Sequence, residues 1–462
     1  MEYSNFLAAK LRAFQPAGFT PRPLVAPLSP FQADLVRWAS RRGRAAIFAS
    51  TGLGKTRMQI EWARQVCAHT GGDVVILSPL AVASQTVAEA KTCGMDVHLC
   101  RDGDDVQPGI NISNYERLHR FDPSRFVGVV LDESSCIKHH ETKTLAHLLE
   151  AFGRTPYRLC ATATPAPNDY TELGTHAEFL GVCSRVEMLA EFFCHDGGET
   201  QVWRLKRHAR AEFWRWVASW AALVRTPSDL GYEDGAYRLP PLSTEHHVIK
   251  ADQGQVFQSG QLFATEAQSL SERRTARKQS IDARCLAAAE LVNATLEPWI
   301  VWCDLNAESE RLVKMIPGAI EVTGSQDIDE KENRLIGFAT GDARVLVSKP
   351  SICGWGLNWQ HCARIAFVGV TDSWESYFQA VRRCWRFGQV RPVEVHIFAS
   401  EAEGAVIKNL ERKAVDAEKM AAALSAETAS VVRGEVRCAT RMTNVYDLRH
   451  FAFPAWLKTR EE

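Results

Sequence analysis

Two separate series of short, continuous apolar runs constrain the fold of this chain more than any other feature. The runs of the first series, each followed by a helical pattern, lie at 45–49, 74–77 and 127–131, and those of the second lie at 299–303, 345–347, 365–368 and 393–398. Runs that are rich in β-branched residues and apolar at every position suit strands covered on both faces, as in a parallel sheet. The pattern therefore predicts two α/β units.

The segment between the two series has a different composition. Turn-forming residues at 226–235 and the Leu-Pro-Pro-Leu stretch at 239–242 are typical of a loop or linker. We place an insertion at about 181–284. After the second series, residues 401–432 have apolar residues at helical spacing, which predicts an amphipathic helix.

Composition and charge exclude several classes of protein. The chain has 462 residues, 46% of them hydrophobic and 24% charged, so wholesale disorder is excluded. A net charge of −1 gives no signal for nucleic acid, and any site for a polyanion must be local. Thirteen cysteines without a Cys-x-x-Cys pair fit a reduced compartment rather than a zinc ribbon. With no signal peptide and no membrane-spanning run, we expect a soluble, cytoplasmic protein.

A glycine-containing loop follows the first predicted strand and opens a helical stretch. Gly52 and Gly54 allow backbone N–H groups to curl around phosphate oxygens, Lys55 can reach the β and γ phosphates, and Thr56 offers a hydroxyl to Mg²⁺. The alternative is a glycine turn without function. The residues expected to bind the nucleotide here are Thr51, Gly52, Leu53, Gly54, Lys55 and Thr56.

Two adjacent carboxylates end the apolar run at 127–131. Asp132 and Glu133 would lie at the carboxyl edge of the sheet, where α/β sheets bind ligands. Asp132 would hold Mg²⁺ and Glu133 would polarise an attacking water, which predicts a nucleoside triphosphate hydrolase. The alternative is that the Asp-Glu-Ser sequence only caps the next helix.

An arginine-rich segment at 379–389 lies near the end of the second series. Arg383 and Arg386 are three residues apart, so on a helix or tight turn both guanidinium groups point the same way. Arginines that reach the γ-phosphate from another domain would make hydrolysis depend on domain closure. A solvated basic face is the alternative.

Taken together, these motifs resemble those of helicase superfamily 2, and within it the SWI/SNF-like DNA-translocating ATPases of a compact bacterial or viral type. The segments that carry the resemblance, in their order along the chain, are 28–32, 52–56, 114–116, 132–138, 162–168, 323–325, 354–358, Trp374 and 379–389. The Asp-Glu pair is followed by Ser134 and Ser135 where the family usually has Ala-His, and Ala163 stands where Gly is usual. Polar coupling through a His is therefore expected to be absent or replaced by Ser.

The resemblance implies an α/β fold of two tandem RecA-like parallel-sheet domains with a mostly helical insertion between them and a C-terminal helix. The expected parts are an N-terminal extension, the first ATP-binding core, the insertion with its linker, the second core and a C-terminal helical extension, at 1–27, 28–180, 181–284, 285–400 and 401–462.

The resemblance also implies an ATP-dependent DNA translocase that uses ATP and Mg²⁺ and is stimulated by nucleic acid, with double-stranded DNA as the expected partner. Gln32 would contact adenine, and Gly356 of the second core would join the nucleotide site. The residues expected to contact nucleic acid are Ser78, Asn114, Tyr115, Thr323, Gly324 and Ser325. We expect a monomer in the bacterial cytoplasm, or in the host cytoplasm if the protein is viral, with a possible protein partner for targeting. A strand-separating DNA or RNA helicase and an inactive nucleic-acid-binding adaptor are the alternatives.

Two basic segments suggest further contacts with nucleic acid. Basic residues at 204–210 are followed by aromatic residues at 213–220, but the helical spacing of Phe213, Trp216 and Trp220 favours packing over base stacking. Phosphate contact by the basic residues stays open. The second cluster, at 273–278, is better explained as a solvated face.

Overall fold

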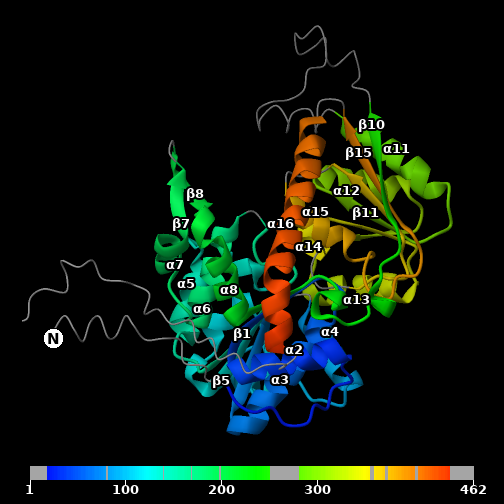
Figure 1. Cartoon of the computed structure of the whole chain (residues 1–462). Helices are drawn as coiled ribbons and strands as arrows, with labels where there is room; N and C mark the ends of the chain where they lie inside the picture. Colours follow the sequence, from blue (N-terminus) through cyan, green and yellow to red (C-terminus); the bar gives the residue numbers. More distant parts are fainter. Residues whose placement is uncertain are drawn as a thin grey trace, which may run out of the picture.

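The computed structural model describes residues 18–79, 82–138, 140–167, 169–196, 199–249, 280–353, 358–369, 373–400 and 404–436. Within them the chain forms two parallel sheets, each covered by helices on both faces (Figure 1). We call each sheet with its helices a lobe. The predicted class of tandem RecA-like parallel-sheet domains is confirmed by this architecture.

The first lobe has a seven-stranded sheet in the order β3-β4-β2-β5-β6-β1-β9. Its strands are β1 (Arg44–Ala49), β2 (Asp73–Ser78), β3 (His98–Leu99), β4 (Ile110–Asn114), β5 (Phe126–Asp132), β6 (Tyr157–Thr162) and β9 (Ala221–Val224). Every ladder in it is parallel. Within β1, Ile47 packs into the hydrophobic core on one face and Phe48 into the core on the other, as expected for a strand buried on both sides.

Different helices cover the two faces of this sheet. One core contains residues of α2 (Pro30–Arg42), α3 (Lys55–Thr70) and α4 (Ala83–Thr92). The opposite core contains residues of α5 (Lys143–Phe152), α6 (Leu173–Leu180), α7 (Arg185–Phe192) and α8 (Arg210–Trp220). The first lobe is thus a three-layer α/β unit.

The second lobe has a six-stranded parallel sheet in the order β10-β15-β14-β11-β13-β12. Its strands are β10 (Leu242–Ile249), β11 (Trp299–Cys303), β12 (Ala319–Val322), β13 (Val345–Ser348), β14 (Arg364–Val368) and β15 (Val393–Ser400). The helices are α11 (Ile281–Asn293), α12 (Asn306–Met315), α13 (Ile328–Thr340), α14 (Pro350–Cys353) and α15 (Trp374–Val381).

The segment 181–284, expected to be a mostly helical insertion, contains the helices α7 and α8 in its described part but also adds strands to both sheets. β9 pairs with β1 at the edge of the first sheet, and β10 pairs with β15 at the edge of the second. The antiparallel hairpin of β7 (Phe193–Asp196) and β8 (Glu199–Leu205) forms a separate two-stranded sheet (Figure 1). The segment therefore completes both lobes, because an edge strand far along the chain can add its hydrogen bonds to an existing sheet.

The aromatic residues at 213–220 are packing residues, as their spacing predicted. Phe213, Trp216 and Trp220 of α8 are buried in the core of the first lobe and contact one another edge-on or at a tilt. Trp214 is buried beside them. None of these rings is available for stacking on a base.

Helix α16 (Gly404–Val436) confirms the predicted C-terminal helix and extends along both lobes (Figure 1). Val406 and Leu410, near its start, belong to the core of the second lobe, whereas Val436 at its end packs into the core of the first. Val415, also expected on the apolar face, is half exposed because it lies between these two contacts. Among the described residues, no helix is long and apolar enough to cross a membrane.

Candidate nucleotide-binding cleft

The glycine-containing loop lies between β1 and α3, in the strand–loop–helix setting that was predicted. Gly52 has φ 91° and Gly54 has φ 77°, a region that side chains other than glycine rarely adopt. Helix α3 begins at Lys55, so its free N–H groups point into the loop. The loop and the helix terminus together can surround an anion such as a phosphate.

Lys55 is held at the base of this loop. Its Nζ donates a hydrogen bond to the carbonyl oxygen of Ala49 at 3.0 Å. Burial of the ammonium lowers the pKa of Lys55, and the positive charges of Arg386 and Arg383 act in the same direction. The carboxylates Glu133 and Asp132 oppose this shift. Charged groups from both lobes therefore act on Lys55.

Asp132 and Glu133 lie at the carboxyl end of β5, as predicted. Asp132 is buried, and its Oδ1 accepts a hydrogen bond from Gln59 Nε2 at 2.6 Å. Burial, with a further contribution from the neighbouring charge of Glu133, raises the pKa of Asp132 to about 6. The carboxylate pair is thus electrostatically costly, which is the situation that a bound cation would relieve.

Glu133 has an unusual backbone conformation. Its φ of 50° lies in the left-handed region, and no other non-glycine residue of the described chain has a positive φ. Such conformations cluster at functional sites. Thr162 Oγ1, at the end of β6, donates to Glu133 Oε2 at 3.4 Å. The turn and Thr162 together orient the Glu133 carboxylate.

The two arginines of the second lobe lie in the turn that follows α15. Arg383 is buried, and it donates to the backbone oxygen and to Oε1 of Gln379 at 3.0 and 3.1 Å. Arg386 lines the space between the lobes. Burial lowers the pKa of Arg383 to about 10 and, with the help of Arg383, that of Arg386 to about 9, while Glu133 of the first lobe opposes both shifts. The charges of both guanidinium groups therefore interact with Glu133 of the first lobe.

A cleft of about 660 Å³ separates the two lobes at this point, and we call it the interlobe cleft. Its walls carry residues of the first lobe, of the linker between β9 and β10, and of the second lobe, among them Gln32, Gly52, Gly54, Thr56, Tyr237, Asn358, Arg386 and Phe387. A cavity of this size accommodates a nucleotide. The cleft brings together the predicted phosphate loop and a predicted arginine of the other lobe.

One end of the cleft is aromatic. The rings of Tyr237 and Phe387 stack with centroids 4.8 Å apart. Gln32 Nε2 donates to Leu53 O at 2.9 Å and to the Tyr237 hydroxyl at 3.3 Å. Gln32 is thus placed next to a flat apolar surface, as required of a residue that contacts a base. Gly356, the other residue predicted at the nucleotide, lies outside the described residues.

Several polar residues of the site carry no motif that sequence reasoning could use. Gln59 lies on α3, where the sequence shows only a helical pattern, and Tyr237 lies in the linker between β9 and β10. Ser134, which directly follows the carboxylate pair, shares a hydrogen bond of 3.2 Å between its Oγ and Nε2 of His176 on α6. Burial lowers the pKa of His176 to about 4, so the ring is neutral at physiological pH. A neutral histidine from another helix therefore contacts the turn that follows the carboxylate pair.

The residues predicted to contact nucleic acid fall into two groups. In the first lobe, the side chains of Ser78 and Asn114 are buried, and the Tyr115 hydroxyl donates to the backbone oxygen of Asp132 at 2.7 Å. These side chains support the sheet, so a contact with phosphate from Ser78 or Asn114 would have to come from the backbone. In the second lobe, residues 323–325 follow β12 at the surface, and Gly324 and Ser325 are exposed. Their contact with nucleic acid stays a prediction.

The basic residues at 204–210 also differ in whether their side chains are exposed or bound within the first lobe. Arg204, Arg207 and Arg210 are exposed. Lys206, by contrast, donates to the backbone oxygens of Ala190 and Glu191 at 2.9 and 2.8 Å and caps the end of α7. The second basic cluster, at 273–278, lies outside the described residues.

No family model matches this chain, and no curated protein matches it. Among solved structures, it is similar to the Sulfolobus solfataricus SWI2/SNF2 ATPase core in complex with dsDNA, with 16% sequence identity and a TM-score of 0.41. The alignment covers 92% of this chain and 99% of that chain. A likeness of this degree leaves the function to be inferred from the interlobe cleft itself.

Proposed function

We propose that this chain is a nucleic-acid-stimulated ATPase of helicase superfamily 2, which hydrolyses ATP to ADP and phosphate and moves along double-stranded DNA. The observation that carries the proposal is the interlobe cleft. The phosphate loop of the first lobe and Arg386 of the second line this cleft, and the charge of Glu133 in the first lobe acts on Arg386. Hydrolysis in such a cleft depends on the approach of the two lobes.

In this proposal the triphosphate lies along the start of α3. Backbone N–H groups of the loop at 52–54 bind its oxygens, and Lys55 is placed to contact the β and γ phosphates. Tyr237 and Phe387 provide a surface for the base, and Gln32 a polar contact beside it.

The donor set fits Mg²⁺. Thr56 offers a hydroxyl and Asp132 a carboxylate whose raised pKa reflects burial and the charge of Glu133. Hard oxygen ligands of this kind, together with phosphate oxygens, are those that Mg²⁺ prefers. The ion would offset the negative charge of the phosphates and the carboxylates.

Glu133 is the residue that we assign to the attacking water. Its carboxylate accepts a hydrogen bond from the water and orients the oxygen toward the γ-phosphorus, while the bond to the β-phosphate oxygen breaks. Thr162 and the left-handed backbone keep the carboxylate in place. Arg386, with Arg383 behind it, stabilises the charge on the phosphoryl oxygens in the transition state.

Double-stranded DNA is the proposed track. The surface residues at 323–325 in the second lobe and exposed arginines at 204–210 in the first are suited to sequence-independent contacts with phosphate. In this proposal the motor acts as a monomer in the cytoplasm, with a protein partner for targeting. Every cysteine that the structure describes is a free thiol, which is consistent with a reducing compartment.

The proposal is tested by the rate of phosphate release from ATP with no nucleic acid, duplex DNA, single-stranded DNA or RNA, at one stated salt concentration. We expect duplex DNA to raise the rate and Lys55→Ala to abolish it. A rate that is the same with and without each nucleic acid would overturn the motor, and a rate raised only by RNA would overturn the choice of track.

A further inference from the structure

A cluster of imidazole and carboxylate groups lies at the edge of the second sheet, away from the interlobe cleft. Strand β10 pairs in parallel with β15, and Glu245 lies directly opposite His396. His247 is two residues beyond Glu245, so both side chains project from the same face of β10. The three side chains therefore meet on one face of two neighbouring strands.

The distances within this cluster are those of ligands around one small cation. His247 Nε2 is 3.1 Å from His396 Nδ1, and Glu245 Oε2 is 3.4 Å from the same Nδ1. Each residue offers one ligand atom, and these atoms lie within 4.8 Å of one another. Two ligand atoms bound tetrahedrally to Zn²⁺ at about 2.0–2.1 Å are about 3.3 Å apart. The two separations from His396 Nδ1 are close to that value.

A neutral His396 cannot satisfy all of its neighbours in this cluster by hydrogen bonding. If His396 Nδ1 accepts a hydrogen bond from His247, its lone pair also faces the Glu245 carboxylate, which is a repulsive contact. If Nδ1 carries the hydrogen and donates to Glu245, then Nε2 of the buried His396 is an unprotonated acceptor that faces the carboxylate of Glu394 at 3.8 Å. In either tautomer, one lone pair of His396 points at a carboxylate.

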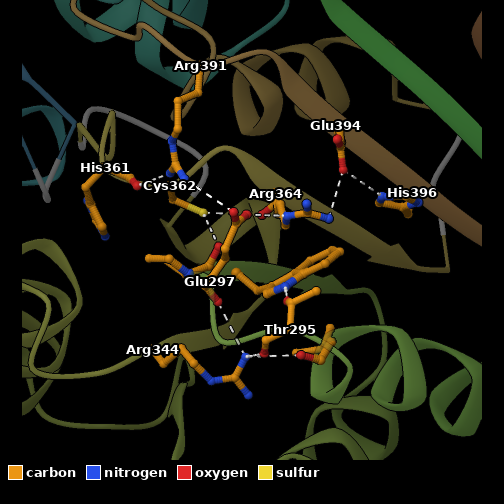
Figure 2. Close-up of polar contacts among 12 residues, drawn as sticks. Thr295, Glu297, Arg344, His361, Cys362, Arg364, Arg391, Glu394 and His396 are labelled. Atoms are coloured by element: carbon orange, nitrogen blue, oxygen red, sulfur yellow. Dashed lines mark hydrogen bonds and ion pairs between the residues drawn. The ribbon is translucent and has the colours of Figure 1, made fainter.

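A cation between the three groups removes this conflict. His396 then binds through Nδ1 and carries its hydrogen on Nε2, directed toward Glu394. Figure 2 shows that Glu394 lies between His396 and Arg364, and Arg364 holds the carboxylate at 2.9 Å. Metal-bound histidines usually donate their second N–H to a carboxylate that is itself fixed in this way. Within the described residues, His396 Nε2 has no hydrogen-bond partner, as expected for a donor that completes its contact on metal binding.

We propose that Glu245, His247 and His396 form a binding site for a divalent transition metal of the Zn²⁺ class, with Glu394 as the carboxylate that orients His396. Two imidazoles and one carboxylate suit Zn²⁺ rather than Mg²⁺. Glu245 is exposed and His247 is partly exposed, so the ion can enter from solvent and retain a water molecule.

The site would fix an edge strand to its sheet. β10 carries the chain from the linker that contains Tyr237, at the interlobe cleft, into the second lobe. Apart from its backbone pairing with β15, β10 is largely exposed. A metal bridge between the two strands would therefore stabilise the position of the linker. This role is independent of the proposed ATPase activity.

The experiment is a titration of the chelator-stripped full-length protein with ZnCl₂ by isothermal calorimetry, and with CoCl₂ by visible absorption. We expect one Zn²⁺ site per chain that depends on His247 and His396, and the absorption spectrum of four-coordinate cobalt. His247→Ala should abolish this site, and Glu394→Gln should weaken it by about 10- to 100-fold. MgCl₂ should not compete.

His246→Ala is the matched control, because His246 is the neighbouring histidine on the opposite face of β10, where it faces Glu411. It should leave the titration unchanged. Equal zinc uptake by wild type and His247→Ala, or no uptake by the stripped wild type, would overturn the proposal. If circular dichroism shows that His247→Ala does not fold, the test uses Glu245→Gln instead, because Glu245 is exposed. An unchanged zinc affinity of Glu245→Gln would contradict the site.

Discussion

Lys138 of the first lobe forms an ion pair with Glu375 on α15 of the second lobe, and Thr164 Oγ1 donates to the other oxygen of the same carboxylate at 3.4 Å. Lys138 follows the turn that starts at Glu133, and Thr164 follows Thr162, which holds the Glu133 carboxylate. Glu375 therefore connects the second lobe to both segments that position the proposed water-activating residue.

Glu375→Gln should uncouple the lobes. We expect kcat for ATP to fall by about 10- to 100-fold with little change in KM, because the nucleotide still binds to the phosphate loop while the catalytic groups are displaced. Steady-state ATPase assays with duplex DNA measure this. Glu330→Gln is the control, since Glu330 makes an exposed ion pair with Arg334 within one helix. An equal effect of both substitutions would contradict a specific role for Glu375.

Lys55→Ala and Glu133→Gln should separate binding from turnover. Removal of the Lys55 ammonium takes away the charge that contacts the triphosphate, so nucleotide binding should be lost. Glu133→Gln keeps the shape of the side chain but not its basicity, so binding should persist while kcat falls by about 10²- to 10⁴-fold. Binding of a fluorescent ATP analogue and phosphate release measure the two effects. Normal turnover by Glu133→Gln would remove this residue from the mechanism.

Asp132→Asn should stabilise the apo protein at neutral pH. The folded pKa is raised from 3.8 to about 6, so the folded state binds the proton more tightly than the unfolded chain does. Stability from this group is therefore lost as the pH rises from about 4 to 6, and the neutral Asn avoids the loss.

The expected gain for Asp132→Asn is about 1–3 kcal/mol at pH values above about 6, falling to near zero below about pH 4. Asn can still accept the hydrogen bond from Gln59. Urea unfolding in metal-free buffer at several pH values measures the difference. If Asp132→Asn were less stable than wild type at neutral pH, the prediction would be wrong, because the ionised Asp132 would then stabilise the fold.

Gly52→Ala should impair the closed arrangement of the lobes. A Cβ at Gly52 would lie 2.8 Å from the backbone nitrogen of Phe387, and the φ of 91° is unfavourable for Ala. Gly71→Ala is the matched control, because Gly71 has φ 73° but nothing within 4 Å of its Cβ position. Both should lose about 1–2 kcal/mol of stability, whereas only Gly52→Ala should lose ATPase activity. Equal activity of the two variants would contradict contact between Phe387 and the loop.

Local signals in the sequence predicted the central strands and the phosphate loop. The runs at 45–49 and 299–303 form β1 and β11 because strands buried on both faces must be apolar throughout. Gly52, Gly54 and Lys55 were recognisable because their spacing fits one short loop before a helix. The helical spacing at 213–220 correctly predicted a buried face.

The features that were not predicted depend on contacts between distant segments. β9 is a four-residue Ala-Ala-Leu-Val run that directly follows the helical pattern of α8, so it did not stand out as a strand. β10 is largely exposed and polar, so it does not have the pattern of a buried strand. Their pairing with β1 and β15 comes from the fold as a whole. Likewise, the approach of Glu375 to Lys138 and of His176 to Ser134 crosses elements that share no motif. The buried Ser78 and Asn114 also show that a motif position need not present its side chain.

The central claim is that one nucleotide is hydrolysed by groups from both lobes, and Arg386 tests it most directly. The measurement is single-turnover hydrolysis of ATP by wild type and Arg386→Ala, with saturating duplex DNA and with nucleotide affinity determined separately. We expect the rate to fall by about 10³-fold or more while ATP still binds. A rate for Arg386→Ala equal to that of wild type would contradict the account.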